Sequence, residues 1–214
     1  MAGILDLLGN KNVQQIIQGV SGETGISQSQ ASSVINMALP LLMGAMQKNS
    51  SDSQGAAGLL SALQSSKHDG SLLDNLGGLF SGGVNSAVTT DGVGILGHLL
   101  GGSNTSTVSN AISNKTGVSS ANVTKILAVL APILMSYLGK QVTSNKVSNS
   151  SGLGSLLNST LGSNQGGSML TSLLDSNGDG SILDDVAGLV LGGGNSTQKK
   201  GGLGGLLGGL FGGK

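Results

Sequence analysis

Apolar residues recur at helical spacing in two long segments, one in each half of the chain. They fall three or four positions apart, at Val34, Met37, Ala38, Leu41, Leu42 and Ala45 in the first segment and at Val123, Ile126, Leu127, Leu130, Ile133, Leu134 and Tyr137 in the second. Pro40 and Pro132 stand within these patterns and predict a kink in each helix, because proline lacks an amide hydrogen and crowds the preceding turn. No segment alternates convincingly with a period of two, so the chain is predicted to be all-α.

Shorter helices are predicted around these two long ones. A first helix is expected in each half, near 11–20 and near 105–114, followed by a Thr-Gly turn. Ser27 and Ser119 come next and are good N-caps, because a serine hydroxyl can accept a bond from an unpaired backbone N–H. The remaining patterns predict two more helices per half, at 56–64, 72–80, 168–174 and 182–191.

The second half of the chain repeats the first. Thr24-Gly25-Ile26-Ser27 recurs 92 positions later as Thr116-Gly117-Val118-Ser119. Asp69-Gly70-Ser71-Leu72-Leu73-Asp74-Asn75 recurs 110 positions later as Asp179-Gly180-Ser181-Ile182-Leu183-Asp184-Asp185. We interpret this as a tandem duplication, with the extra residues of the second copy placed in the Ser/Asn/Gly-rich stretch 143–168.

The duplication predicts three parts of the chain: a first helical repeat at 1–90, a second at 91–194 and a low-complexity tail at 195–214. The repeats could form one compact pair or two independent units joined by a linker around 81–94. We favour the compact pair, because repeat units that cannot each bury a core usually pack together.

Composition narrows the function. The 214 residues include 39 glycines but only 9% charged and 1% aromatic residues, with no cysteine and zero net charge. A neutral chain has no electrostatic surplus for nucleic acid, and the lack of cysteine excludes disulfides, zinc-thiolate sites and thiol nucleophiles. The start of the chain lacks the features of a secretory signal, and the apolar run Ile126 to Met135 is too short to span a bilayer. A cytoplasmic protein is predicted.

The segment 175–185 concentrates the chemistry of the chain. Asp175, Asn177 and Asp179 occupy positions 1, 3 and 5 of an EF-hand-like loop, Gly180 allows the sharp turn at position 6, and the carbonyl of Ser181 is the ligand at position 7. Position 12 is a valine instead of the usual glutamate, so an aspartate must close the site. The predicted Ca²⁺ ligands are Asp175, Asn177, Asp179, Ser181 and Asp185.

The first half provides an internal comparison for this loop. Lys67 stands where the second half has Asn177, so the first copy cannot bind calcium in the same manner. The Asp-Gly-Ser-x-Leu-Asp pattern is nevertheless present in both copies. It predicts a helix start with Ser71 or Ser181 as N-cap and with Asp74 or Asp184 as the acid of a capping box. A turn and cap without an ion is therefore the alternative to the calcium site.

Together these motifs resemble a bacterial family of uncharacterised proteins, domain of unknown function 937. The resemblance rests on the paired Thr-Gly-(Ile/Val)-Ser segments, on Pro-Leu-Leu-Met at 40–43 and Pro-Ile-Leu-Met at 132–135, and on Asp179–Asp185. It covers most of residues 1–193 and implies an all-helical bacterial protein without an assigned activity. The loop separately resembles Asp-x-Asp-x-Asp-Gly calcium loops, including dockerin-like ones.

Catalytic groups are scarce in this sequence. His68 and His98 are the only histidines; we expect His68 in an exposed turn and His98 solvated or packed on a short apolar segment. No serine elbow follows a strand, and the glycine clusters lack the Gly-Lys-Ser/Thr ending of a phosphate loop. We therefore expect a non-enzymatic scaffold or interaction protein that binds an unknown protein partner or itself.

The tail suggests an alternative function. Leu203, Leu206, Leu207, Leu210 and Phe211 would share one helical face, but every position between them is glycine, which predicts disorder in water. Against a membrane the tail 199–214 could fold, with its lysines near anionic headgroups. The alternative is therefore a membrane-associating or self-assembling protein, and an inert tail also stays open.

Overall fold

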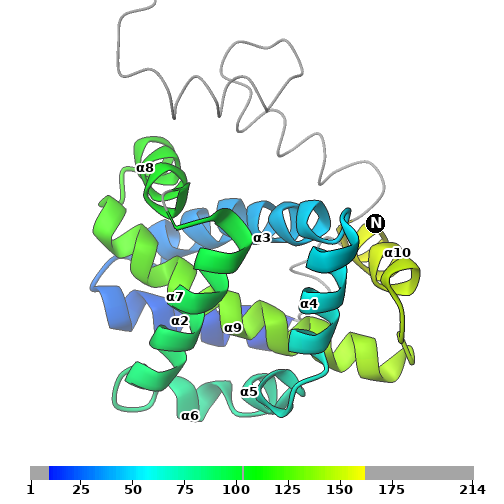
Figure 1. Ribbon diagram of the computed structural model, residues 1–214. Coiled ribbons are helices and arrows are strands. Elements are labelled where there is room, and N and C mark those ends of the chain that lie inside the picture. Colours follow the sequence, from blue (N-terminus) through cyan, green and yellow to red (C-terminus); the bar gives the residue numbers. More distant parts are fainter. Residues whose placement is uncertain (1–9, 103, 162–214) are drawn as a thin grey trace, which may run out of the picture.

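The computed structural model describes residues 10–102 and 104–161, and the regular structure in these ranges is entirely helical (Figure 1). The prediction of an all-α fold is confirmed. In chain order the elements are α2 (Asn10–Thr24), α3 (Gln28–Asn49), α4 (Ser53–Leu63), the 3₁₀ turn η1 (Ser66–His68), α5 (Ser71–Asp74), α6 (Leu76–Phe80), α7 (Ser86–Leu100), α8 (Asn104–Thr116), α9 (Ser120–Ser144) and α10 (Ser150–Leu161).

The two Thr-Gly-x-Ser segments adopt the same local structure. In each half the threonine hydroxyl donates to a carbonyl one turn back, the glycine takes a left-handed conformation, and the serine side chain caps the next helix. The φ angles of Gly25 and Gly117 are 69° and 71°. The predicted N-caps Ser27 and Ser119 are confirmed. Shared local geometry agrees with a tandem duplication, which itself stays a prediction.

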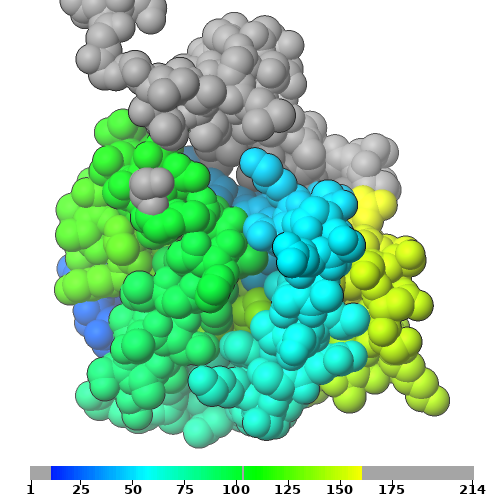
Figure 2. Space-filling view, in the orientation of Figure 1, coloured from blue at the N-terminus to red at the C-terminus, as the bar shows by residue number. Residues whose placement is uncertain are grey.

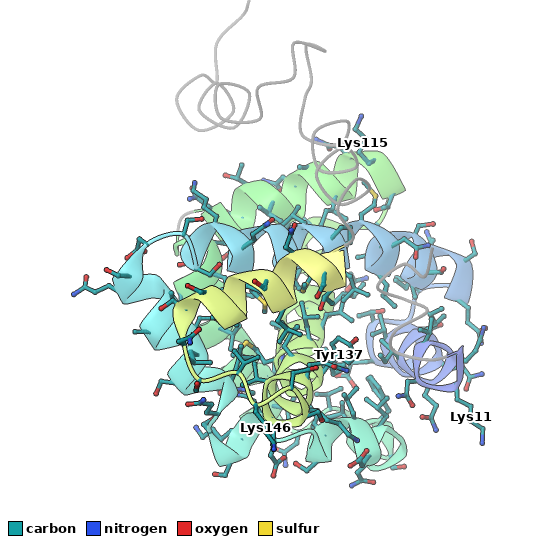
Figure 3. All side chains as sticks on the ribbon, turned by 90° about the vertical axis from the view of Figure 1, so that its right-hand side faces the viewer. Lys11, Lys115, Tyr137 and Lys146 are labelled. Carbon is teal, nitrogen blue, oxygen red and sulfur yellow. The ribbon has the colours of Figure 1, made fainter. Side chains whose placement is uncertain are left out.

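Helix α9 is the central element of the core. Its residues from Ile126 to Gly139 are all buried, and α2, α3, α4, α5, α7, α8 and η1 pack around it. Figure 3 shows Tyr137 of α9 in the middle of the fold, whereas Lys11 and Lys115 lie at its edges. Burial raises the pKa of the Tyr137 phenol above its ordinary value. A helix that is apolar on every side requires this complete coverage.

The same helix also has the length and composition of a membrane span. Ser120–Ser144 contains an 18-residue window with a mean hydropathy of 1.6, although 78% of that window is buried inside the fold. The continuous apolar run Ile126–Met135, considered by itself, is too short to span a bilayer. The helix that contains this run is longer, because it continues through residues of mixed polarity at both ends. In this structure the apolar surface of α9 packs against other helices.

Each half places a helix on the central helix of the other half. Helix α4 packs on α9, and α10 packs on α3. No helix was predicted over α10, which lies in the stretch 143–168 assigned to the extra residues of the second copy, and the predicted helix 168–174 lies outside the described residues. Figure 3 shows α10 lying across α3, and Figure 2 shows α4 and α10 side by side on one face. One hydrophobic cluster contains side chains from both halves. Residues 86–94, expected to lie in a linker if the halves were independent, belong instead to α7, which packs along α9.

Both prolines lie within their helices, and each helix continues past its proline. Pro132 has no N–H to donate to the carbonyl of Ala128, four residues earlier. Gly92 of α7 lies directly against this carbonyl, so closely that an added Cβ would overlap the Ala128 oxygen. The freed carbonyl thus lies at the crossing of α7 and α9, where only a glycine permits such a close approach.

Replacing Gly92 with alanine should lower the free energy of unfolding by about 1–3 kcal/mol, because the new methyl group forces α7 away from α9. The matched control is Gly94→Ala in the same helix, where an added Cβ meets no atom within 4 Å. That control should leave stability unchanged or raise it by up to about 1 kcal/mol, through better helix propensity. Urea unfolding followed by circular dichroism measures both; equal effects would contradict the close crossing.

Candidate functional site

The predicted calcium ligands lie outside the described residues. Asp175, Asn177, Asp179, Ser181 and Asp185 all fall beyond residue 161, as does the tail 195–214. In the described part of the chain, no group of three or more histidine, aspartate or glutamate side chains could hold a metal ion. The structure therefore shows only the first-half counterpart of this motif, the turn from Asp69 to Asn75.

The turn at Asp69 begins α5 in a different way from the one predicted. The Asp69 carboxylate accepts a hydrogen bond from the Ser71 backbone N–H at 2.9 Å, and Gly70, with φ of 103°, is the N-cap residue. Hydrogen bonds with the Ser71 side chain and backbone hold the pKa of Asp69 below its ordinary value. The predicted N-cap role of Ser71 is wrong in this half, because the helix begins one residue earlier and the N–H groups of Leu73 and Asp74 are bonded to the Gly70 carbonyl.

Asp74 does not act as a capping-box acid either. Its carboxylate is bonded to the Lys140 ammonium of α9 at 2.9 Å, in an exposed ion pair. Beside this pair, Gly139 of α9 lies against the main chain of the turn, and an added Cβ there would overlap the His68 carbonyl oxygen. The turn therefore rests directly on α9 through a glycine contact and an ion pair.

His68 is buried, contrary to the prediction of an exposed turn. Only 5% of its surface is exposed, and its Nδ1 lies 2.9 Å from the Ala62 carbonyl oxygen. Its Nε2 lies 3.3 Å from a carboxylate oxygen of Asp91 in α7. Local sequence carries no signal for this contact, because Asp91 is 23 residues away and only the packing of α7 brings it close. His98, also in α7, is exposed.

Ser65 completes a Ser–His–Asp series that superficially resembles a hydrolytic triad. Its Oγ lies 3.2 Å from Nδ1 of His68, but the hydroxyl also donates to the Ala62 carbonyl at 2.7 Å. A nucleophile needs a free hydroxyl beside an accessible site, and here the imidazole is enclosed by protein. The series therefore attaches η1 to α7 and has the properties of a structural contact.

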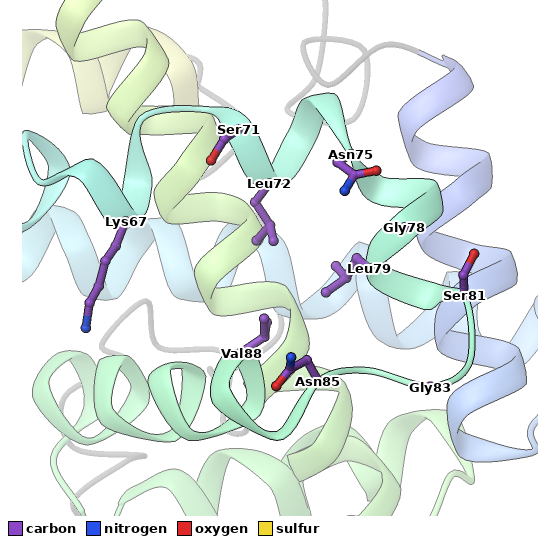
Figure 4. Close-up of a pocket in the computed structure, with 10 residues that line it drawn as sticks. All are labelled: Lys67, Ser71, Leu72, Asn75, Gly78, Leu79, Ser81, Gly83, Asn85 and Val88. Atoms are coloured by element: carbon purple, nitrogen blue, oxygen red, sulfur yellow. The ribbon is translucent and has the colours of Figure 1, made fainter.

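An open groove lies beside this turn, between η1, α5, α6 and the start of α7 (Figure 4). Its volume is about 660 Å³. In Figure 4 Leu72, Leu79 and Val88 converge on its interior, while Lys67 lies at the opposite end from Ser81. Lys67 carries the only charge among the lining residues, which also include Ser71, Asn75, Gly78, Gly83 and Asn85. The groove thus offers apolar contacts and neutral hydrogen-bonding groups.

Comparison with known proteins identifies the family. The model of the family described as "Bacterial protein of unknown function (DUF937)" matches residues 6–141 and 145–214. The chain belongs to this family. The first matched segment ends within α9, and the second contains α10 and the Asp-rich loop. No curated protein matches the chain, and no solved structure matches it. The resemblance to DUF937 is confirmed, whereas the dockerin-like calcium loop stays a prediction.

For this DUF937 protein, His68→Ala should lower the free energy of unfolding by about 1–3 kcal/mol. The substitution removes a buried ring and the hydrogen-bonding partner of the Asp91 carboxylate. His98→Ala is the matched control and should change stability by less than about 0.5 kcal/mol, since His98 is exposed. Chemical denaturation measures both; a negligible effect of His68→Ala would place that histidine outside the core.

Proposed function

We propose that this DUF937 protein is a non-enzymatic helical interaction protein, with a calcium-binding loop at 175–185 and a cytoplasmic location. The observation that carries the interaction role is the groove beside η1, α5, α6 and α7. Its apolar interior and mostly neutral lining suit a polypeptide segment of a protein partner. A single lysine is a poor basis for nucleic-acid binding, which requires several phosphate contacts.

The Ser65–His68–Asp91 series, in which the histidine is buried, supports a role without catalysis. Its serine hydroxyl is bonded to the main chain, and its imidazole is almost fully enclosed. The residues that line the groove include no carboxylate and no histidine, so among them no side chain is suited to general acid–base chemistry near neutral pH. The groove therefore has the groups for recognition and lacks the usual groups for proton transfer.

The first-half turn supports the calcium proposal by showing what the shared motif does without a metal. There the Asp-Gly-Ser backbone is stabilised by Asp69 and by the left-handed Gly70, so the turn requires no ion. Asp175 and Asn177 are additions of the second half, which has Asn177 in place of Lys67. Two further oxygen donors in the second-half motif support a cation there, since Ca²⁺ prefers several oxygen ligands.

Calcium titration tests this part of the proposal. Isothermal titration of the intact chain with CaCl₂ should give a one-site binding curve, and Asp175→Ala/Asp179→Ala should abolish it, because two of the carboxylate ligands are lost. The matched control is Asp69→Ala, which changes the first-half turn and should leave calcium binding intact. Absence of binding heat, with the same thermal midpoint in CaCl₂ and in EDTA, would rule out the calcium site.

Self-association through the tail is the second candidate function, and α6 favours it. Residues 76–80 have the sequence Leu-Gly-Gly-Leu-Phe, which recurs at 207–211. In α6 this pentapeptide buries Leu76 and Leu79, and the Phe80 ring lies against Gly19 of α2. The same five residues in the tail can therefore dock on a helical surface, and the tail lies outside the described residues.

Deletion of 199–214 tests this second candidate. Sedimentation velocity over a range of concentrations should show oligomers of the full chain and a monomer after the deletion, because the apolar side chains of the tail are lost. Leu207→Asp/Phe211→Asp should act like the deletion, whereas Lys199→Ser/Lys200→Ser should not. Flotation with anionic vesicles distinguishes membrane association. Oligomers and vesicle binding that persist unchanged in the truncated chain would contradict a role for the tail.

A further inference from the structure

We propose that residues 179–190 dock on α3 and α8 in the manner in which residues 69–80 dock on α9 and α2. In this arrangement Lys48 pairs with Asp184, and Val190 lies against Ala111. The proposal rests on the repeated sequence and on the packing of the described helices. It does not require calcium, so the calcium site and this docking can succeed or fail separately.

The packing of the two halves is reciprocal wherever both partners are described. Helix α2 packs on α3 and on α9, and correspondingly α8 packs on α9 and on α3. Each half also places a helix on the central helix of the other half, α4 on α9 and α10 on α3. One further set of contacts is described for the first half only. In it η1 and α5 lie on α9, and α6 lies on α2. Its reciprocal surface is formed by α3 and α8.

The charges fit this reciprocal arrangement. Lys140 of α9 pairs with Asp74 at 2.9 Å. The counterpart of Lys140, 92 positions earlier, is Lys48 in the last turn of α3, and the counterpart of Asp74, 110 positions later, is Asp184. Lys48 is exposed and has no ion-pair partner within the described residues. A cation thus stands on α3 where docking of 179–190 would bring a carboxylate.

The side-chain sizes fit as well. The Phe80 ring lies so close to Gly19 that an added Cβ at this position would overlap it. In the second half the glycine is replaced by Ala111, which has this Cβ, and the phenylalanine is replaced by Val190, which is smaller. Relative to the first-half pair, the helix position has a methyl group in place of a hydrogen, and the docking position has an isopropyl group in place of an aromatic ring. This paired change allows a similar close contact, since overpacked interfaces are destabilised.

The chain can reach this surface. Helix α10 ends at Leu161 and packs on α3, so the described chain ends with an element that contacts one of the two helices that would receive the segment. The intervening residues can span up to roughly 60 Å at about 3.3–3.6 Å each. We limit the docked segment to 179–190 because the counterpart of Gly139 is Gln47. A glutamine there prevents the close main-chain approach that the His68 carbonyl makes in the first half.

Zero-length carbodiimide crosslinking of the full chain tests the ion pair. The reagent joins a lysine to a carboxylate in contact with it, and the Lys140–Asp74 link in the same molecule is the positive control. The monomer band, prepared in EDTA, is digested and mapped by mass spectrometry. We expect both the Lys140–Asp74 and the Lys48–Asp184 links. Formation of the first without the second would overturn the proposal.

A substitution cycle tests the size match independently. Val190→Phe should lower the thermal midpoint by several degrees, because the larger ring meets the Cβ of Ala111. In the Ala111→Gly background, which recreates the first-half pair, Val190→Phe should cause no further loss. Ala111→Gly alone gives the cost of glycine in the helix. An equal loss from Val190→Phe in both backgrounds would show that the two positions do not meet.

Discussion

The need to cover α9 on every side is the constraint on which the rest of this structure depends. A 25-residue helix that is apolar around most of its circumference cannot face water, and the chain has almost no aromatic side chains to cover it. Coverage comes from Leu, Ile, Val and Met side chains of the surrounding helices and, at two points, from the close approach of another main chain. Gly92 lies against the Ala128 carbonyl that Pro132 leaves free, and Gly139 lies against the His68 carbonyl. At each of these contacts a glycine lets the two main chains approach closely, so no large side chain is needed to fill the space between them.

The candidate groove is a consequence of how α9 is covered. The turn before α5 rests on α9 through Gly139 and through the Lys140–Asp74 pair, while the His68–Asp91 contact joins the same turn to α7. The short helices α5 and α6, which are separated by Asn75, form one side of the groove. The start of α7 forms the other side. The contacts that hold the turn therefore also shape the groove.

Local features were predictable and distant contacts were not. Ser27 and Ser119 cap their helices as predicted, because a cap depends on residues within one turn of the helix. The cap at Ser71 was predicted wrongly, since the N–H groups of Leu73 and Asp74, from which a capping serine would accept, are bonded to the Gly70 carbonyl. The burial of His68 was missed because it depends on Asp91 in a different helix. The predicted calcium ligands lie outside the described residues and stay predictions.

The sequence by itself determined that the chain is all-α, where its long helices begin, and that it belongs to the DUF937 family, because periodicity, caps and motifs are local properties of the chain. The tertiary structure alone decided that α4 and α10 lie on the central helix of the opposite half. It also decided that His68 is enclosed and that α7 crosses α9 at Gly92. These outcomes depend on which apolar faces meet, and many pairings of similar Leu-, Ile- and Val-rich faces satisfy the same sequence pattern.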